Sequence, residues 1–120
     1  MRPLVQLTRH GVTFDRIPCS ADGSLLIEKA EELLKPNTRL LVCLHASNVC
    51  GAIMPVQELR KFCKKHGLLF ILDTAQTAGT VPIDMESLQL DALAFTGHKG
   101  LRGPQGTGGF LIRNELASPN

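Results

Sequence analysis

The sequence contains neither tryptophan nor tyrosine, so five phenylalanines are its only aromatic residues. Proteins that bind single-stranded nucleic acid usually stack bases on aromatic rings beside a strongly basic groove. The formal net charge of this chain is only +2, which is too small to indicate such a groove. The composition therefore argues against a nucleic-acid partner.

Long hydrophobic runs are also missing. No stretch reaches the roughly 20 apolar residues of a membrane-spanning helix, and the start, MRPLVQLTRHGV, has no apolar core of a signal peptide. Hydrophobic residues make up 43% and charged residues 20% of the 120 residues, which is typical of a globular domain with a core. We therefore expect a cytoplasmic protein without membrane attachment.

Closely spaced metal ligands and cysteine pairs are absent as well. The four cysteines form no C-x-x-C pair, and no two of the four histidines stand four residues apart, although zinc sites need closely spaced ligands. We expect no metal site, and reduced thiols rather than a disulfide framework. Cys50 lies in a loop and is expected to be a small buried thiol.

Apolar segments of strand length are what the sequence does contain. Four of them have the nearly continuous hydrophobicity of buried strands: RLLVCLHA, LLFILD, DALAFTG and GGFLIRN, at residues 39–46, 68–73, 91–97 and 108–114. Residues 11–25 are expected to form a further short strand, followed by a turn at Asp22-Gly23. The chain after the last strand is expected to be free of helix.

Two segments between these strands have apolar residues at helical spacing. The first covers residues 25–34, with Ser24 as its expected N-cap. The second covers residues 55–67, with proline in its first turn and glycine at its end. The alternation of strands and helices predicts an α/β fold with a mostly parallel sheet and flanking helices.

Polar side chains follow the carboxyl ends of three predicted strands, where an open α/β sheet binds its ligands. They are Asn48, Asp73, Gln76, Thr96, His98 and Lys99. Taken singly, each has a structural explanation: an aspartate at a strand end often accepts hydrogen bonds in a turn, and a loop lysine often lies in solvent. It is their convergence on one sheet edge that predicts a site.

These residue types together fit pyridoxal phosphate. This cofactor needs a lysine for its aldehyde and an acid facing its pyridine nitrogen, which Lys99 and Asp73 provide. Hydroxyl, imidazole and backbone N–H groups suit its phosphate, and the glycines of GLRGPQGTGG let the backbone turn tightly beside it. A nucleotide-binding loop is the weaker alternative, because in a Walker A motif the glycines precede the lysine.

Three motifs in order, SNVCG, LDTAQ and TGHKGLRGPQGTGG, resemble the central part of class V aminotransferase-fold enzymes. These are pyridoxal-phosphate enzymes of fold type I, and the similarity is to the cysteine desulfurase group, from about Val42 to Arg113. The resemblance implies that Lys99 binds the cofactor covalently and Asp73 pairs with its pyridine nitrogen. It also implies that Gln76 and Asn48 lie near the phenolic oxygen.

The remaining roles implied by the resemblance concern the phosphate, which Thr96 and His98 would help to hold. His45 is interpreted as a structural residue at a strand end.

Members of the family are several times longer, with a phosphate loop before this region and a small domain after it that carries the persulfide-forming cysteine. We therefore expect residues 1–120 to be a piece of the large cofactor-binding domain, without a complete second domain and with exposed apolar surface.

The function implied by the resemblance is that of a cysteine desulfurase, which converts L-cysteine to alanine and passes the sulfur to an enzyme persulfide. A homodimer and a sulfur-acceptor protein are the implied partners. A class V aminotransferase or a selenocysteine lyase would use the same scaffold. A catalytically inactive α/β module is the alternative outside enzymes, and this chain alone is expected to be poorly active.

Overall fold

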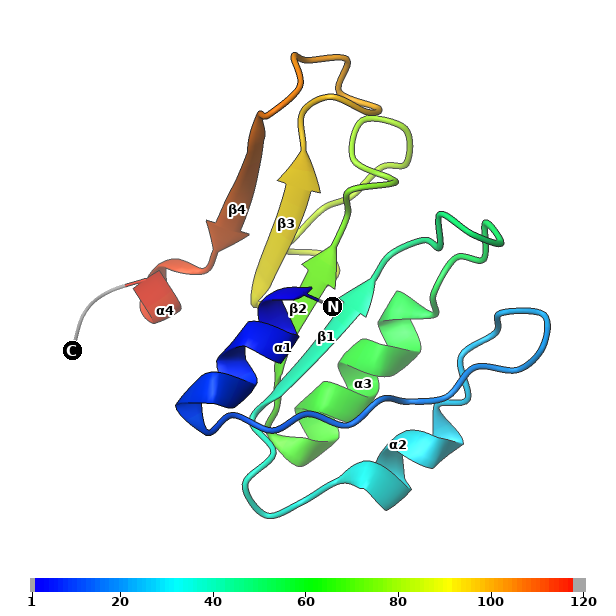
Figure 1. Ribbon diagram of the computed structural model, residues 1–120, viewed down its shortest axis with the longest axis vertical. Coiled ribbons are helices and arrows are strands. Elements are labelled where there is room, and N and C mark those ends of the chain that lie inside the picture. Colours follow the sequence, from blue (N-terminus) through cyan, green and yellow to red (C-terminus); the bar gives the residue numbers. More distant parts are fainter. Residues whose placement is uncertain (1, 118–120) are drawn as a thin grey trace.

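A four-stranded sheet forms the centre of the molecule (Figure 1). The computed structural model describes residues 2–117. The strands lie in the order β1-β2-β3-β4 and cover Leu40–Leu44, Leu69–Asp73, Ala92–Thr96 and Gly108–Ile112. The first three are parallel, and β4 runs antiparallel to β3. The structure therefore confirms the predicted α/β fold with a mostly parallel sheet.

Helix α3 makes the crossover from β1 to β2 and covers Val56–His66. It begins directly after Pro55 and ends at Gly67, whose φ of +64° is readily adopted by glycine. The Gly67 N–H donates to the carbonyls of Cys63 and Lys64. Both ends of this helix were thus predictable from the sequence. The other helices are α1 (Arg2–Leu7), the 3-10 helix η1 (Thr8–His10), α2 (Glu28–Leu33) and α4 (Asn114–Ala117).

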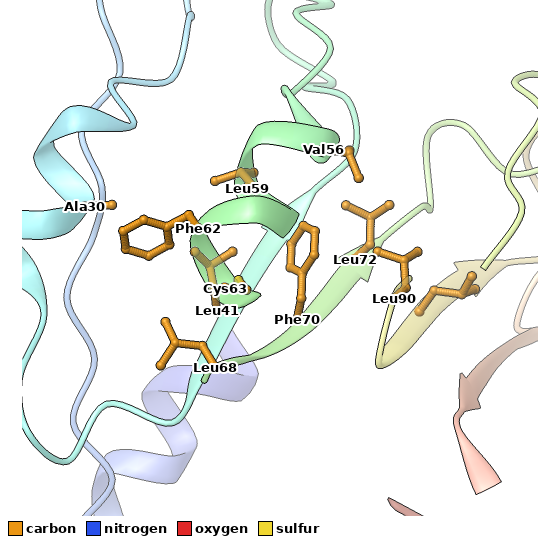
Figure 2. Packing of buried hydrophobic residues seen from close by; sticks show 11 residues of the cluster. Ala30, Leu41, Val56, Leu59, Phe62, Cys63, Leu68, Phe70, Leu72 and Leu90 are labelled. Atoms are coloured by element: carbon orange, nitrogen blue, oxygen red, sulfur yellow. The ribbon is translucent and has the colours of Figure 1, made fainter. Parts of the chain in front are cut away.

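The core lies between α3 and one face of the sheet (Figure 2). Leu59 and Cys63 on α3 pack toward Phe70 and Leu72 on β2, and all four side chains are fully buried. Buried residues recur about every 3.6 positions on α3 and every second position on β2, so that each element presents one buried apolar face to the other. This packing fixes β2, and with it the edge where β2 ends.

The opposite face of the sheet carries exposed apolar side chains. Leu40, Val42 and Leu44 on β1 are 40–44% exposed, and Phe110 on β4 is 54% exposed. Pairing through β2 and β3 places these residues on one face. Strands that are apolar on both faces are typical of sheets covered on both sides. The expected exposed apolar surface is therefore confirmed.

Three expectations about local structure are wrong. The short strand expected within residues 11–25 does not form in the described chain, which has only an isolated bridge, Cys19 to Leu25, in this region. Next to that bridge the Ser24 N–H donates to Asp22 Oδ1 (2.9 Å), and the Ser24 carbonyl accepts the Ser20 N–H (2.9 Å). Helix α2 consequently begins at Glu28, and Ser24 does not cap it.

The third wrong expectation concerns the end of the chain, where α4 forms although no helix was predicted. The N–H groups of Leu116 and Ala117 both donate to the Arg113 carbonyl, which closes a single helical turn. Helix α1 was not predicted either. No helix within residues 2–117 is long and apolar enough to cross a membrane.

Candidate functional site

The carboxyl ends of β1, β2 and β3 meet at one edge of the sheet (upper edge in Figure 1). Leu44, Asp73 and Ala94 are neighbours in register. Beyond them the ladder continues for one more step, since His45 N–H donates to the Asp73 carbonyl and Thr74 N–H to that of Ala94, both at 2.8 Å. The three loops that carry the predicted site residues therefore leave the sheet side by side.

Asp73 is the last residue of β2, and its side chain is exposed. Its Oδ1 accepts a hydrogen bond from the Ala75 N–H at 2.9 Å. This is the turn role that a strand-end aspartate commonly plays. The described residues give Oδ2 no hydrogen bond, so the carboxylate holds the turn with one oxygen and offers the other to a ligand.

The turn after β2 and the loop after β3 are in direct contact. Thr96 Oγ1 donates to the Ala75 carbonyl at 3.3 Å. A Cβ placed on Gly79 would lie 2.6 Å from the carbonyl carbon of Gly100, and one placed on Gly100 would lie 2.4 Å from the Ala78 oxygen. Residues 73–79 and 96–100 are thus held together at the edge, as the sequence predicted.

This close approach predicts a marked effect of Gly79→Ala. The residue has a φ of +85°, and its new Cβ would overlap the backbone of residue 100. Gly106→Ala is the matched control, because its φ is +83° but nothing lies within 4 Å of the added carbon. We expect Gly79→Ala to lower the free energy of unfolding by about 1–3 kcal/mol more than the control does, measured by urea denaturation. Equal losses would show that the contact is not tight.

Four of the predicted site side chains have free polar groups. Asn48, Gln76, His98 and Lys99 make no side-chain hydrogen bond or ion pair within the part of the chain that the structure describes. His98 and Lys99 are exposed, and Gln76 is half-buried. Unpaired amide, imidazole and ammonium groups at one edge are available to a ligand.

Asn48 is the least connected of the six predicted residues. It is exposed on the loop between β1 and α3, which Ala46 and Ile53 close by an isolated bridge. Within residues 2–117 no hydrogen bond joins its side chain to the turn after β2 or to the loop after β3. Asn48 therefore lies on the loop that leaves β1 at this edge, and within residues 2–117 its side chain has no hydrogen bond to the other five predicted residues.

A hollow in the surface adjoins the two loops, and Thr74, Ala78 and Gly79 of the turn after β2 form part of its wall. It is apolar, and Val81, Leu93, Phe95 and Leu111 are among the residues that line it. None of the six predicted site residues contributes to its wall. The candidate site is consequently an open edge bounded by two loops.

Cys50 differs from its prediction as a buried thiol, because it is exposed. Hydrogen bonds from the Ser47 side chain and the Ala52 N–H lower the pKa of the Cys50 thiol. Burial has the opposite effect on the two thiols near the core, and it raises the pKa of Cys43 to about 12 and that of Cys63 to about 11. The exposure of Cys50 could not be predicted from sequence, because it depends on how the loop that carries this residue packs.

The amino-acid sequence of this chain is similar to those of known proteins. A cysteine desulfurase IscS from Shewanella baltica (strain OS223) is 34% identical over 110 residues, which are 92% of this chain and 27% of the relative. A probable cysteine desulfurase from Pyrococcus abyssi is 37% identical over 108 residues, 90% of this chain and 27% of the relative. The chain thus spans about a quarter of the length of these relatives.

Solved structures give the same result for the fold. The apo structure of a cysteine desulfurase from Thermococcus onnurineus NA1 has a TM-score of 0.82 and 38% identity, and the match covers 92% of this chain and 27% of that one. The cysteine desulfurase CsdA from Escherichia coli has a TM-score of 0.88 and 29% identity, with 97% and 29% covered. SspA in complex with cysteine has a TM-score of 0.87 and 26% identity, with 98% and 33% covered.

The family model described as Aminotransferase class-V matches residues 1–119. That range includes both contacting loops and all three strands whose carboxyl ends form the candidate site. The chain belongs to the class V aminotransferase family.

Proposed function

We propose that residues 1–120 form part of the large cofactor-binding domain of a pyridoxal-phosphate-dependent enzyme similar to cysteine desulfurases. The observation that carries the proposal is the contact between the turn holding Asp73 and Gln76 and the loop holding Lys99. The whole protein would act in the cytoplasm on L-cysteine as a homodimer and transfer sulfur to an acceptor protein. The names of its relatives and the cysteine-bound SspA structure support this choice of substrate.

The residues present fit the cofactor. Lys99 has an exposed amine without a partner in the described part of the chain. The aldehyde of pyridoxal phosphate needs such an amine for covalent attachment. Asp73 keeps Oδ2 for a protonated pyridine nitrogen, because only Oδ1 is used in the turn. Gln76 has a side-chain NH2 group without a partner in the described part of the chain, and it can donate to the phenolic oxygen. His98 offers a ring nitrogen to the phosphate, whereas the hydroxyl hydrogen of Thr96 already goes to the Ala75 carbonyl.

The chemistry at this edge would be divided among the chain's own residues. When bound, pyridoxal phosphate supplies a conjugated ring that withdraws electrons from the substrate's α-carbon. Asp73 would hold the proton on the ring nitrogen, since a carboxylate favours the charged form of its partner. Lys99 would carry a proton to or from the α-carbon. Asn48 and Gln76 would orient the ring and the substrate carboxylate.

Ligand-dependent stability tests this proposal against its alternatives. We expect pyridoxal phosphate at 100 times its Kd to stabilise the chain by about 2.7 kcal/mol, seen as a higher melting temperature. ATP should give no shift, whereas a nucleotide-binding loop would reverse the two results. Lys99→Ala should remove most of the shift. Without any shift from pyridoxal phosphate in the unmodified chain, an inactive module would be the better account.

A further inference from the structure

A buried histidine lies directly behind the candidate site. His45 follows the last residue of β1 and is 7% exposed. Its backbone N–H donates to the Asp73 carbonyl (2.8 Å), and its carbonyl accepts the Met54 N–H (2.9 Å). These two bonds tie His45 to the end of β2 and to the returning arm of the loop that carries Asn48.

The imidazole ring of His45 makes a contact that reaches far along the chain. Its Nδ1 lies 2.9 Å from Oγ1 of Thr77, which is 32 residues later in the sequence and 4% exposed. Thr77 directly follows Gln76 in the turn after β2. A buried polar group is costly unless it is hydrogen-bonded, so the His45 ring depends on Thr77 for the partner of its Nδ1.

Thr77 is also bonded within its own turn. Its backbone N–H and that of Ala78 both donate to the Thr74 carbonyl, and the Thr77 hydroxyl is 3.4 Å from the same oxygen. Thr74 in turn donates through Oγ1 to the Ala94 carbonyl on β3 (2.9 Å). The ring of His45 therefore connects the end of β1 to a hydrogen-bonded turn that is fixed to β3.

We propose that His45 is a positioning residue for the cofactor site, which rests on the function proposed above. Its ring holds Thr77, and Thr77 holds the turn in which Asp73 and Gln76 face the Lys99 loop. Burial lowers the pKa of His45, which favours the neutral ring suited to a hydroxyl partner. The alternative is an ordinary core residue that contributes only to overall stability.

Substitutions that keep or remove the Nδ1 group separate these two roles. Asparagine places its amide close to the position of Nδ1, whereas alanine leaves no polar group there. We expect His45→Ala and Thr77→Val each to weaken pyridoxal phosphate binding about tenfold, measured by absorbance titration of the folded protein. His45→Asn should recover most of the affinity. The double variant should be no weaker than either single one, because both remove the same hydrogen bond.

A matched control accounts for general destabilisation. Leu41→Ala removes a side chain of β1 that is 8% exposed and packs in the core away from the turn. It should lower the free energy of unfolding as His45→Ala does and leave the affinity of the folded protein unchanged. Equal weakening by Leu41→Ala, or unchanged affinity in His45→Ala, would overturn the proposal.

Hydrogen exchange provides a readout that does not depend on the cofactor. The amides of residues 77 and 78 should exchange at least about tenfold faster in His45→Ala than in His45→Asn, because their turn has lost its anchor. If the unmodified chain fails to bind pyridoxal phosphate, the proposed function is contradicted, and exchange alone decides the role of His45. Equal exchange in the two variants would overturn that role.

Discussion

An Asp91→Ala variant is expected to lose about 3–5 kcal/mol of its free energy of unfolding. The Asp91 side chain is 3% exposed, and its Oδ2 accepts hydrogen bonds from Arg60 Nη1 (3.0 Å) and the Phe70 N–H (2.7 Å). Oδ1 forms an ion pair with Arg113. One carboxylate thus joins α3, β2 and the end of β4 at the amino end of β3.

The expected loss of stability is large because the Asp91→Ala substitution would leave Arg60 without its ion-pair partner. The Arg60 side chain is 18% exposed, and its Nε has no hydrogen-bond partner within residues 2–117. An unpaired buried charge costs far more than a broken surface pair. Domains of this kind are stable by only about 5–15 kcal/mol, so the variant would lose a large share of its stability.

A surface ion pair supplies the control for Asp91. Asp15 pairs with Lys35 at 2.6 Å, but the two side chains are 41% and 52% exposed. Asp15→Ala should therefore cost less than about 1 kcal/mol. Both variants are compared by urea denaturation followed by circular dichroism, with Asp91→Asn as a milder change if Asp91→Ala does not fold. Similar small losses at positions 15 and 91 would contradict the assignment of Asp91 as the central buried ion-pair residue.

Asp73→Ala is expected to have the largest effect on the proposed site among variants that keep Lys99. We expect pyridoxal phosphate to bind at least about tenfold more weakly, which corresponds to about 1.4 kcal/mol. The substitution removes the only predicted partner of the pyridine nitrogen and also the acceptor for the Ala75 N–H. Absorbance titration measures the change.

Two variants separate the charge of Asp73 from its role in the turn. Asp73→Asn keeps an acceptor for the Ala75 N–H but has no charge, so it should also bind weakly. Asp84→Ala removes an aspartate that accepts the Glu86 N–H (2.9 Å) in a turn outside the site, and it should bind normally. Normal binding by Asp73→Asn would mean that the turn matters and the charge does not.

The parts of the fold that could be predicted from sequence have local causes. The apolar run of β2 and the Pro55 and Gly67 boundaries of α3 determine these elements without reference to distant residues. The short strand expected within residues 11–25 was wrong because a strand needs a neighbouring strand to pair with, and that cannot be read from the segment itself. The predicted start of α2 was wrong because Leu25 forms a bridge with Cys19 and the Ser24 N–H donates to Asp22 Oδ1, contacts that precede the helix.

The candidate site, like the fold, has some features that could be predicted from sequence and others that could not. The position of Asp73 and Lys99 at this edge was predictable, because Asp73 ends one recognisable strand and Lys99 follows another, and parallel strands end at the same edge. The hydrogen bond between His45 and Thr77 was not, since it joins two loops through side chains 32 residues apart. The role of Thr96 at the phosphate stays a prediction; the hydrogen bond that its hydroxyl donates to the Ala75 carbonyl could not be foreseen from sequence.

The most direct test of the central claim is to find where pyridoxal phosphate attaches. The purified chain is mixed with the cofactor, reduced with borohydride and digested, and the labelled peptide is identified by mass spectrometry. We expect one modified residue, Lys99, with the label lost in Lys99→Ala and reduced in Asp73→Ala. Labelling spread over surface lysines such as Lys61 and Lys64 would contradict a cofactor site at this edge of the sheet.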